Sequence, residues 1–140
     1  MEKKPKVTGI GGVFFKSEDP DATRAWYGKH LGLAISPWGS SFEFRNAHDP
    51  AEINYLSWSP FKLDTDYFEP SKKAFMINYR VQNLDGMLDQ FKRDGVQIIG
   101  EVQSFEYGRF AHIMDLDGNK IELWEPIDEV FTAMGGETTK

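Results

Sequence analysis

Two side chains in the last third of the chain, His112 and Glu122, are of types that can transfer a proton or hold a metal ion. They stand on two stretches with strand-like alternation, residues 107–114 and 120–124, joined by a turn at 115–119. Because residues two apart in a strand share a face, His112 and Glu122 are expected to be cross-strand neighbours, about 5 Å apart at Cβ. A carboxylate among apolar neighbours needs a partner of this kind.

The pKa of Glu122 decides between two roles for this carboxylate. Burial among apolar side chains would raise the pKa, whereas Arg80, Lys16 or a protonated His112 would lower it. If burial prevails, we expect Glu122 to be a general base that removes a proton next to a carbonyl, with Arg80 or His112 stabilising the oxyanion. If the ion pairs prevail, Glu122 anchors the fold. The sequence leaves both roles open.

The first half of the chain predicts the element order βαβββ. Residues 10–16 alternate as a strand, and Asp19 and Pro20 then supply a helix N-cap and a first-turn proline. The helix is expected over residues 21–31, with Gly32 ending it. Three short strands follow at 33–35, 41–45 and 53–58, separated by Pro, Gly and Asn residues.

The second half predicts the same order again. Residues 75–81 form a strand, Asn83 caps a helix whose apolar residues recur at i, i+3, i+4 and i+7, and Gly95 ends that helix. Strands are expected at 96–99, 107–114 and 120–124. Residues 12–16 align with residues 76–80 at an offset of 64, which indicates an internal duplication.

The duplication predicts an α+β fold with a single domain over residues 1–126. Its two tandem βαβββ modules are residues 8–59 and 74–126, and they are expected to form a curved mixed sheet with a cup-shaped cavity and helices on the outer face. Residues 60–73 are interpreted as a linker, in which Tyr67 and Phe68 would suit a flap over a pocket. Residues 127–140 form a tail with a short amphipathic helix.

The composition indicates a cytoplasmic protein that binds neither nucleic acid nor a membrane. The chain has 140 residues, no cysteine and a formal net charge of −6. An acidic chain with scattered lysines is a poor partner for phosphates, and the charge mildly favours a neutral or cationic ligand. No apolar run approaches the roughly 20 residues of a membrane span, and the lack of cysteine agrees with a reducing compartment.

The closing segment, Tyr-Gly-Arg-Phe-Ala-His-Ile-Met-Asp-Leu-Asp-Gly-Asn-Lys-Ile-Glu-Leu-Trp-Glu-Pro at 107–126, resembles the last hairpin of the vicinal-oxygen-chelate superfamily. That superfamily includes glyoxalase I, extradiol dioxygenases, fosfomycin-modifying enzymes and bleomycin-binding proteins. The likeness extends over residues 8–126, with Trp26-Tyr27 and Leu31-Gly32-Leu33 as further points of similarity. The resemblance implies paired βαβββ modules around a cup and a homodimer.

Metal-dependent members of the superfamily hold an ion in the cup with ligands from the first and last strands of each module. The resemblance carries these positions to Gly12, Leu56, Met76 and Glu122, of which only Glu122 suits a hard cation. We therefore predict neither a metal nor another cofactor. The alternative is a relocated divalent-metal site made by Glu122, His112 and a linker carboxylate, Asp64 or Asp66.

Without an ion, the cup is expected to bind a small organic ligand between apolar walls and a few polar anchors. The catalytic candidates are Glu122, His112 and Arg80. The ligand-binding candidates are Phe14, Lys16, Trp58, Met76, Asn78, Tyr107, Phe110, Met114 and Trp124. Two hypotheses follow: a metal-independent binding protein similar to bleomycin-resistance proteins, or a glyoxalase-like lyase or isomerase with Glu122 as base. The sequence specifies neither the ligand nor whether one chain or two build the cup.

Overall fold

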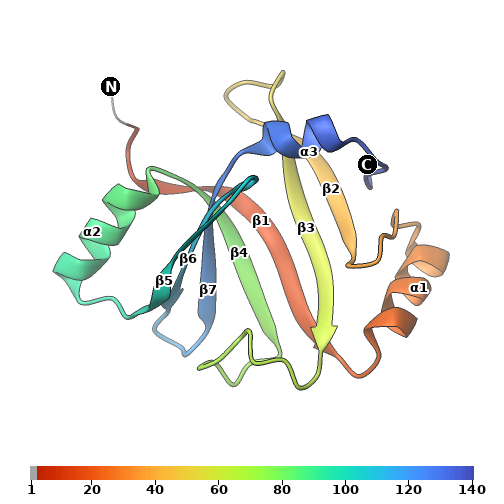
Figure 1. Cartoon of the computed structure of the whole chain (residues 1–140), viewed down its shortest axis with the longest axis horizontal. Helices are drawn as coiled ribbons and strands as arrows, with labels where there is room; N and C mark the ends of the chain where they lie inside the picture. The colour runs from red at the N-terminus through yellow and green to blue at the C-terminus, as the bar shows by residue number, and fades with distance from the viewer. Residues whose placement is uncertain (1–2) are drawn as a thin grey trace.

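The computed structural model describes residues 3–140 and contains one sheet with three helices (Figure 1). The first module consists of β1 (Lys6–Ser17), α1 (Pro20–Leu31), β2 (Ser40–Arg45) and β3 (Ile53–Lys62). The second consists of β4 (Phe75–Gln82), α2 (Leu84–Asp94), β5 (Ile98–Phe105), β6 (Gly108–Met114) and β7 (Lys120–Pro126). The tail forms α3 (Asp128–Met134). Within the described residues, no helix is long and apolar enough to cross a membrane.

The sheet has seven strands in the order β2-β3-β1-β4-β7-β6-β5, with the two modules meeting at the antiparallel pair β1–β4. Each module adds its last strand in parallel to its first, β3 to β1 and β7 to β4. The register supports the duplication. At an offset of 64, Gly12 is equivalent to Met76 and Phe14 to Asn78, and the structure pairs Gly12 with Asn78 and Phe14 with Met76, as two-fold symmetry between the strands requires. The α+β class and the curved mixed sheet are confirmed.

The outer face of the second module holds the larger hydrophobic core. Helix α2 begins at Asn83, whose side chain accepts a hydrogen bond from the Gly86 amide, and ends at Gly95 in the left-handed region that glycine adopts readily. The buried side chains from α2 and from strands β4, β6 and β7 pack together here: Val81, Leu84, Met87, Leu88, Ala111, Ile113 and Leu123. Alternation therefore leaves the other side chains of these strands for the concave face.

Helix α1 covers the same outer face in the first module, but loosely. Asp19 caps it through the Ala22 amide, as expected, yet none of its residues is buried. Its Tyr27 ring packs 4.6 Å from the Trp58 ring, centroid to centroid, and Trp58 also packs against Phe15. Trp58 consequently lies on the outer face, and the prediction that it lines the cup is wrong. The register explains this. Trp58 pairs with Val13, which alternates with the concave-facing Phe14 and therefore points to the outer face.

The expected strand at 33–35 is absent, so the first module has three strands. Ser36 and Gly39 form only an isolated bridge around a tight turn. The outer edge of β2 is occupied by Thr139 of the tail, whose N–H donates to the Ser41 carbonyl while its own carbonyl accepts from the N–H of Glu43. The tail thus makes the backbone hydrogen bonds to β2 that the expected strand would have made. It also covers the edge of the sheet.

The connector between the modules is shorter and more ordered than the predicted linker 60–73. Strand β3 continues to Lys62, so the connector runs over residues 63–74. Phe68 is completely buried and packs with Phe14 and Met76 on the concave face. The Lys16 ammonium lies 5.8 Å from the centre of the Phe68 ring. The connector is therefore packed into the sheet at one end of the concave face.

Candidate functional site

Glu122 is almost fully buried on the concave face and accepts three hydrogen bonds. Asn78, its partner across the parallel strands β4 and β7, donates from Nδ2 over 2.7 Å. His112, its partner across the β6–β7 hairpin, places Nε2 at 2.8 Å. The hydroxyl of Tyr67 donates to the same oxygen as His112. The expected pairing of His112 with Glu122 is thus present.

These donors determine the ionisation of Glu122. Burial, the largest single influence, opposes the charged form, but the hydrogen bonds from His112, Tyr67 and Asn78 together with the charge of His112 outweigh it. The pKa of Glu122 is therefore lowered. An ionised carboxylate has no hydrogen to give, so Nε2 of His112 carries the proton between them. Of the two roles left open by the sequence, this geometry favours Glu122 as an anchor of the fold rather than a general base. The donors to Glu122 are Tyr67, Asn78 and His112, and not the expected Arg80 or Lys16.

Tyr67 is the residue by which the connector reaches the site. Burial and the neighbouring Glu122 carboxylate raise the pKa of its hydroxyl, so Tyr67 remains a hydrogen-bond donor. Lys120 donates from Nζ to the Tyr67 carbonyl over 2.7 Å and lies 5.3 Å from the centre of its ring. Burial lowers the pKa of Lys120, while Glu122, Asp66 and Glu69 act in the opposite direction. The connector is consequently bound to β7 at two successive concave-facing residues.

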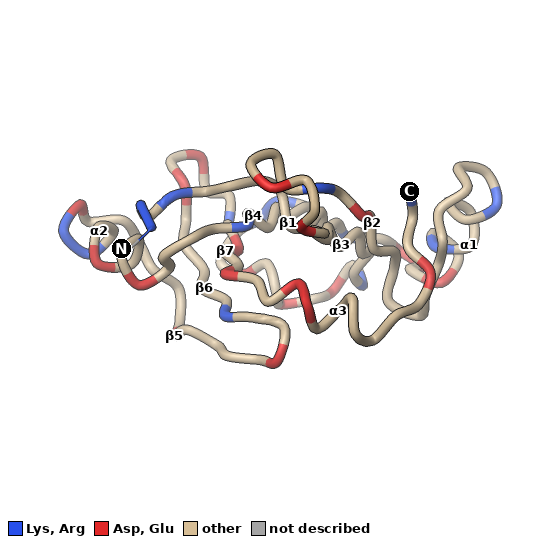
Figure 2. Tube along the Cα trace, turned by 90° about the horizontal axis from the view of Figure 1, so that it is seen from above, with Lys and Arg blue, Asp and Glu red and all other residues tan. Residues whose placement is uncertain are grey.

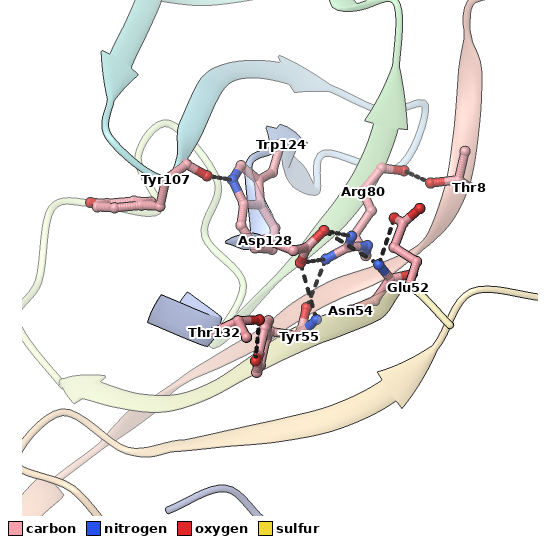
Figure 3. Close-up of polar contacts among 9 residues, drawn as sticks. All are labelled: Thr8, Glu52, Asn54, Tyr55, Arg80, Tyr107, Trp124, Asp128 and Thr132. Atoms are coloured by element: carbon pink, nitrogen blue, oxygen red, sulfur yellow. Dashed lines mark hydrogen bonds and ion pairs between the residues drawn. The ribbon is translucent and has the colours of Figure 1, made fainter. Parts of the chain in front are cut away.

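Arg80 serves a different partner from the one expected. It forms a buried ion pair with Asp128, at the start of α3, in which Nη1 donates to Oδ1 over 2.9 Å and Nη2 donates to Oδ2 (Figure 3). Nη1 also donates to the Tyr55 carbonyl over 2.9 Å. The guanidinium is stacked over Trp124, with its carbon 5.1 Å from the ring centre. Arg80 is therefore engaged by α3 and does not contact Glu122.

Helix α3 packs on the concave face, opposite the side covered by α2 (Figure 2). Its Phe131 ring contacts Tyr55, Tyr107 and Trp124, with centroids 5.4, 5.7 and 5.9 Å away. The hydroxyls of Tyr55 and Thr132 are 2.8 Å apart, and Nε1 of Trp124 donates to the Tyr107 carbonyl over 2.9 Å (Figure 3). The tail helix therefore packs against this subunit and covers one end of the cup.

Eight of the nine predicted ligand-binding residues are associated with the concave face, Trp58 being the exception. Half of them are buried: Phe14 and Met76 pack with Phe68, Trp124 packs with Phe131, and Asn78 is bonded to Glu122. The others are half-buried, namely Lys16, Tyr107, Phe110 and Met114. The concave face is thus closed at one end by the connector and at the other by α3, with Phe110 and its aromatic neighbours between them.

The ligand positions implied by the superfamily do not fit a metal ion. The register sets Ser59 opposite Phe14 as Glu122 is set opposite Asn78, so Ser59 is the counterpart of Glu122 and Leu56 is not. Leu56 shares the outward face of Trp58. Across residues 3–140, no three His, Asp or Glu side chains are grouped so that they could hold an ion. Asp64 and Asp66 are likewise not gathered with Glu122 and His112.

Two cavities lie beside the sheet, one next to α2 and one next to α3. One of about 250 Å³ lies between α2 and β5, where the β5–β6 ladder shifts register between Ile99 and Gln103. The other, of about 370 Å³, lies beside α3. The first is lined by aliphatic side chains together with Lys92, Glu101 and His112, and the second includes Glu52, Asp128 and Glu129.

Three residues that shape the site were not among the predicted site residues: Tyr67, Asp128 and Phe131. Tyr67 was noted only as part of a flap, and Phe131 only as part of the amphipathic tail. The sequence did not single out Asp128, because Asp128 and Glu129 are both carboxylates between the apolar residues Ile127 and Val130. Arg80 was expected on the concave face, but a buried cation needs a counter-charge, and that this comes from Asp128 depends on where the tail helix packs.

Neither a protein-family model nor a curated protein sequence matches this chain. Several solved structures do match in three dimensions. Methylmalonyl-CoA epimerase from Mycobacterium tuberculosis is 24% identical, with a TM-score of 0.59 over 94% of this chain and 97% of that chain. A Streptomyces coelicolor methylmalonyl-CoA epimerase variant in complex with 2-nitronate-propionyl-CoA is 13% identical, with a TM-score of 0.64 over 86% and 99%.

The Mn(II)-bound glyoxalase from Novosphingobium aromaticivorans is 17% identical and has a TM-score of 0.60. The alignment covers 87% of this chain and 40% of that longer chain. At these sequence identities the similarity shows a shared fold. It does not assign the activities of these proteins to this chain.

Proposed function

Because the chain has the vicinal-oxygen-chelate fold in a divergent form, we propose that it binds a small organic ligand on its concave face without a bound metal ion. The observation that carries the proposal is a continuous aromatic cluster on that face. Trp124 stacks on Phe110 at 5.9 Å, and Phe110 contacts Phe105 and Tyr107 at 5.8 and 5.7 Å. Phe105 is 48% exposed, so the cluster leads from the buried interior to solvent.

The chemistry of this surface suits a planar or aromatic ligand. Ring faces and edges bind other rings by offset stacking and edge contacts, and they also attract cations. Met114 adds a polarizable side chain that adapts to varied shapes. The net charge of −6 agrees with a neutral or cationic ligand.

Glu122 supports the metal-independent part of the proposal. Its carboxylate already accepts hydrogen bonds from three protein donors, and the other positions implied for ligands hold Gly12, Met76 and Ser59. The same contacts weaken the lyase or isomerase hypothesis, since a general base near neutral pH requires a raised pKa and that of Glu122 is lowered.

Fluorescence titration tests the proposal. We would replace the two exposed tryptophans, Trp26→Phe and Trp38→Phe, so that emission comes from Trp58 on the outer face and Trp124 on the concave face. Titration with 2-naphthol and with proflavine, a planar aromatic cation, should give a saturable change that EDTA does not alter. Phe110→Ala should weaken binding at least fivefold, about 1 kcal/mol for a lost aromatic pair.

The matched control is Phe44→Ala, which truncates a 52% exposed phenylalanine on β2, away from the cluster. It should leave the affinity unchanged. A titration without saturation, or an equal loss in the two variants, would contradict the proposal.

We also propose that the chain forms a homodimer through its first module. Helix α1 buries none of its residues, and large apolar side chains are exposed around it and β2: Trp26, Leu31, Ile35, Trp38 and Phe44. Sedimentation should show a dimer that Trp38→Lys shifts toward monomer. Leu116→Lys, which changes an isolated and fully exposed leucine, is the control and should leave the dimer intact. A wild-type monomer would contradict this proposal.

A further inference from the structure

The carboxylate of Asp128 is held in a socket of hydrogen-bond donors on the concave face. Besides the two guanidinium hydrogen bonds from Arg80, Oδ1 accepts from the backbone N–H of Tyr55 at 3.2 Å, and Oδ2 accepts from Nδ2 of Asn54 at 3.3 Å. We call Arg80, the Tyr55 amide and Asn54 the Arg80 socket. Arg80 is only 7% exposed, so the socket lies inside the molecule. Bidentate guanidinium contacts together with amide donors are the usual recognition of a carboxylate.

A second compartment adjoins the socket and holds the Phe131 ring. Tyr55, Tyr107 and Trp124 surround that ring, and we call these three residues the aromatic cage. Trp124 joins the two compartments, because it also lies under the Arg80 guanidinium. Since Asp128 and Phe131 are three residues apart on one helix, they project from the same side of α3 and enter socket and cage together.

The segment that carries these two side chains has little stability of its own. Helix α3 spans the seven residues Asp128–Met134, and no side chain caps its N-terminus. Helices of this length do not form in isolation, so α3 depends on its contacts with the sheet. The socket and cage belong instead to strands β3, β4 and β7 and to the residue before β6. The site is therefore built by the sheet, whereas its occupant lies on a helix that depends on the sheet for its stability.

We infer that the Arg80 socket and the aromatic cage form a binding site for a small arylalkyl carboxylate, with Asp128 and Phe131 as its intramolecular occupant. The ligand places its carboxylate on Arg80 and its ring among Tyr55, Tyr107 and Trp124, and α3 moves away. Charge balance is preserved, because one carboxylate replaces another and Arg80 is never buried without a partner. This site lies beneath α3, apart from the exposed end of the aromatic cluster.

Removing the internal occupant tests the inference. In the variant Asp128→Ala/Phe131→Ala, 3-phenylpropanoate should raise the melting temperature, and its calorimetric affinity should exceed that for the wild type at least tenfold, because competition by α3 is gone. Glu129→Ala, an exposed neighbour on α3, is the control and should bind as the wild type does. The uncharged 3-phenylpropanamide should not stabilise the double variant. Equal binding of acid and amide, or no gain over the wild type, would overturn the inference.

A second measurement uses the wild type and remains decisive if the double variant does not fold. Millimolar 3-phenylpropanoate should accelerate hydrogen exchange of the amides of α3 while leaving α2 unchanged. Unaltered exchange of α3 would overturn the inference. The proposed function is tested independently of this inference. Binding of 2-naphthol and proflavine is expected to depend on Phe110, whereas binding of 3-phenylpropanoate depends on the Arg80 socket.

Discussion

Tyr67, in the connector between the two modules, donates its hydroxyl hydrogen to the carboxylate of Glu122 on the last strand of the sheet. Glu122 is thereby joined to the connector, to β4 through Asn78 and to β6 through His112. A position that holds a metal ion in related folds, as the resemblance implies, is here the centre of a hydrogen-bonded cluster. The cluster stabilises the concave face, which we propose binds an organic ligand.

We predict that Tyr67→Phe destabilises the protein by about 1–3 kcal/mol, because Glu122 loses a donor while remaining buried. Urea denaturation would measure the change in the free energy of unfolding. Tyr27→Phe is the control, since the Tyr27 ring packs on Trp58 and its hydroxyl has no hydrogen-bond partner among residues 3–140, and it should change stability by less than about 0.5 kcal/mol. Equal effects of the two substitutions would show that the Tyr67 hydroxyl does not support Glu122.

The lowered pKa of Glu122 predicts a specific pH dependence of stability. A carboxyl group with a depressed pKa in the folded state stabilises the fold fully above its unfolded pKa, here 4.5, and loses that contribution as the pH falls through the folded value. The difference in unfolding free energy between the wild type and Glu122→Gln should therefore be largest near neutral pH and shrink below pH 4.5. Denaturation at several pH values measures it. A difference that grows on acidification would mean that the pKa is raised.

Gly11 permits a close approach of β1 to the second module. A Cβ atom at this position would lie 2.3 Å from Oδ1 of Asn78 and 2.9 Å from Cε3 of Trp124. Asn78 cannot yield easily, because its amide is bound to Glu122. Gly11→Ala should therefore cost about 1–3 kcal/mol through overpacking. Gly9→Ala, on the same strand with its nearest atom at 3.9 Å, is the control and should be tolerated in thermal melting. Equal melting temperatures would contradict the packing argument.

The buried ion pair between Arg80 and Asp128 is expected to stabilise the attachment of α3. Asp128→Asn should lower the free energy of unfolding by about 3–5 kcal/mol, because it leaves the guanidinium buried without a counter-charge. Asp21→Asn is the control, since Asp21 pairs with Arg24 at the surface and is 92% exposed, and it should cost less than about 1 kcal/mol. Chemical denaturation measures the free energy of unfolding of both variants. Comparable decreases would show that the ion pair of Asp128 contributes no more than a surface ion pair.

Sequence reasoning predicted the parts of the fold that depend on local patterns. Caps at Asp19 and Asn83, terminal glycines at Gly32 and Gly95, and the two-residue period of β4, β6 and β7 each follow from short-range rules, and the structure contains them. The facing of His112 and Glu122 followed from the length of one turn. These features need no knowledge of distant contacts.

The remaining features depend on contacts between distant residues. The face of Trp58 depends on the register of β3 against β1, which sets Ser59 at the position equivalent to Glu122, three residues from the expected Leu56. The strand expected at 33–35 is replaced by Thr139, more than 100 residues away along the chain. Asp128 and Tyr67 reach the site from the tail and the connector, segments whose periodicity is too weak to predict where they pack.

The most direct test of the central claim is a calorimetric titration of Mn²⁺ into the metal-stripped protein. The account predicts no saturable heat, because Glu122 already accepts hydrogen bonds from Tyr67, Asn78 and His112, and no group of three His, Asp or Glu side chains among residues 3–140 could hold an ion. Saturable binding of one ion per chain that Glu122→Gln abolishes would contradict it.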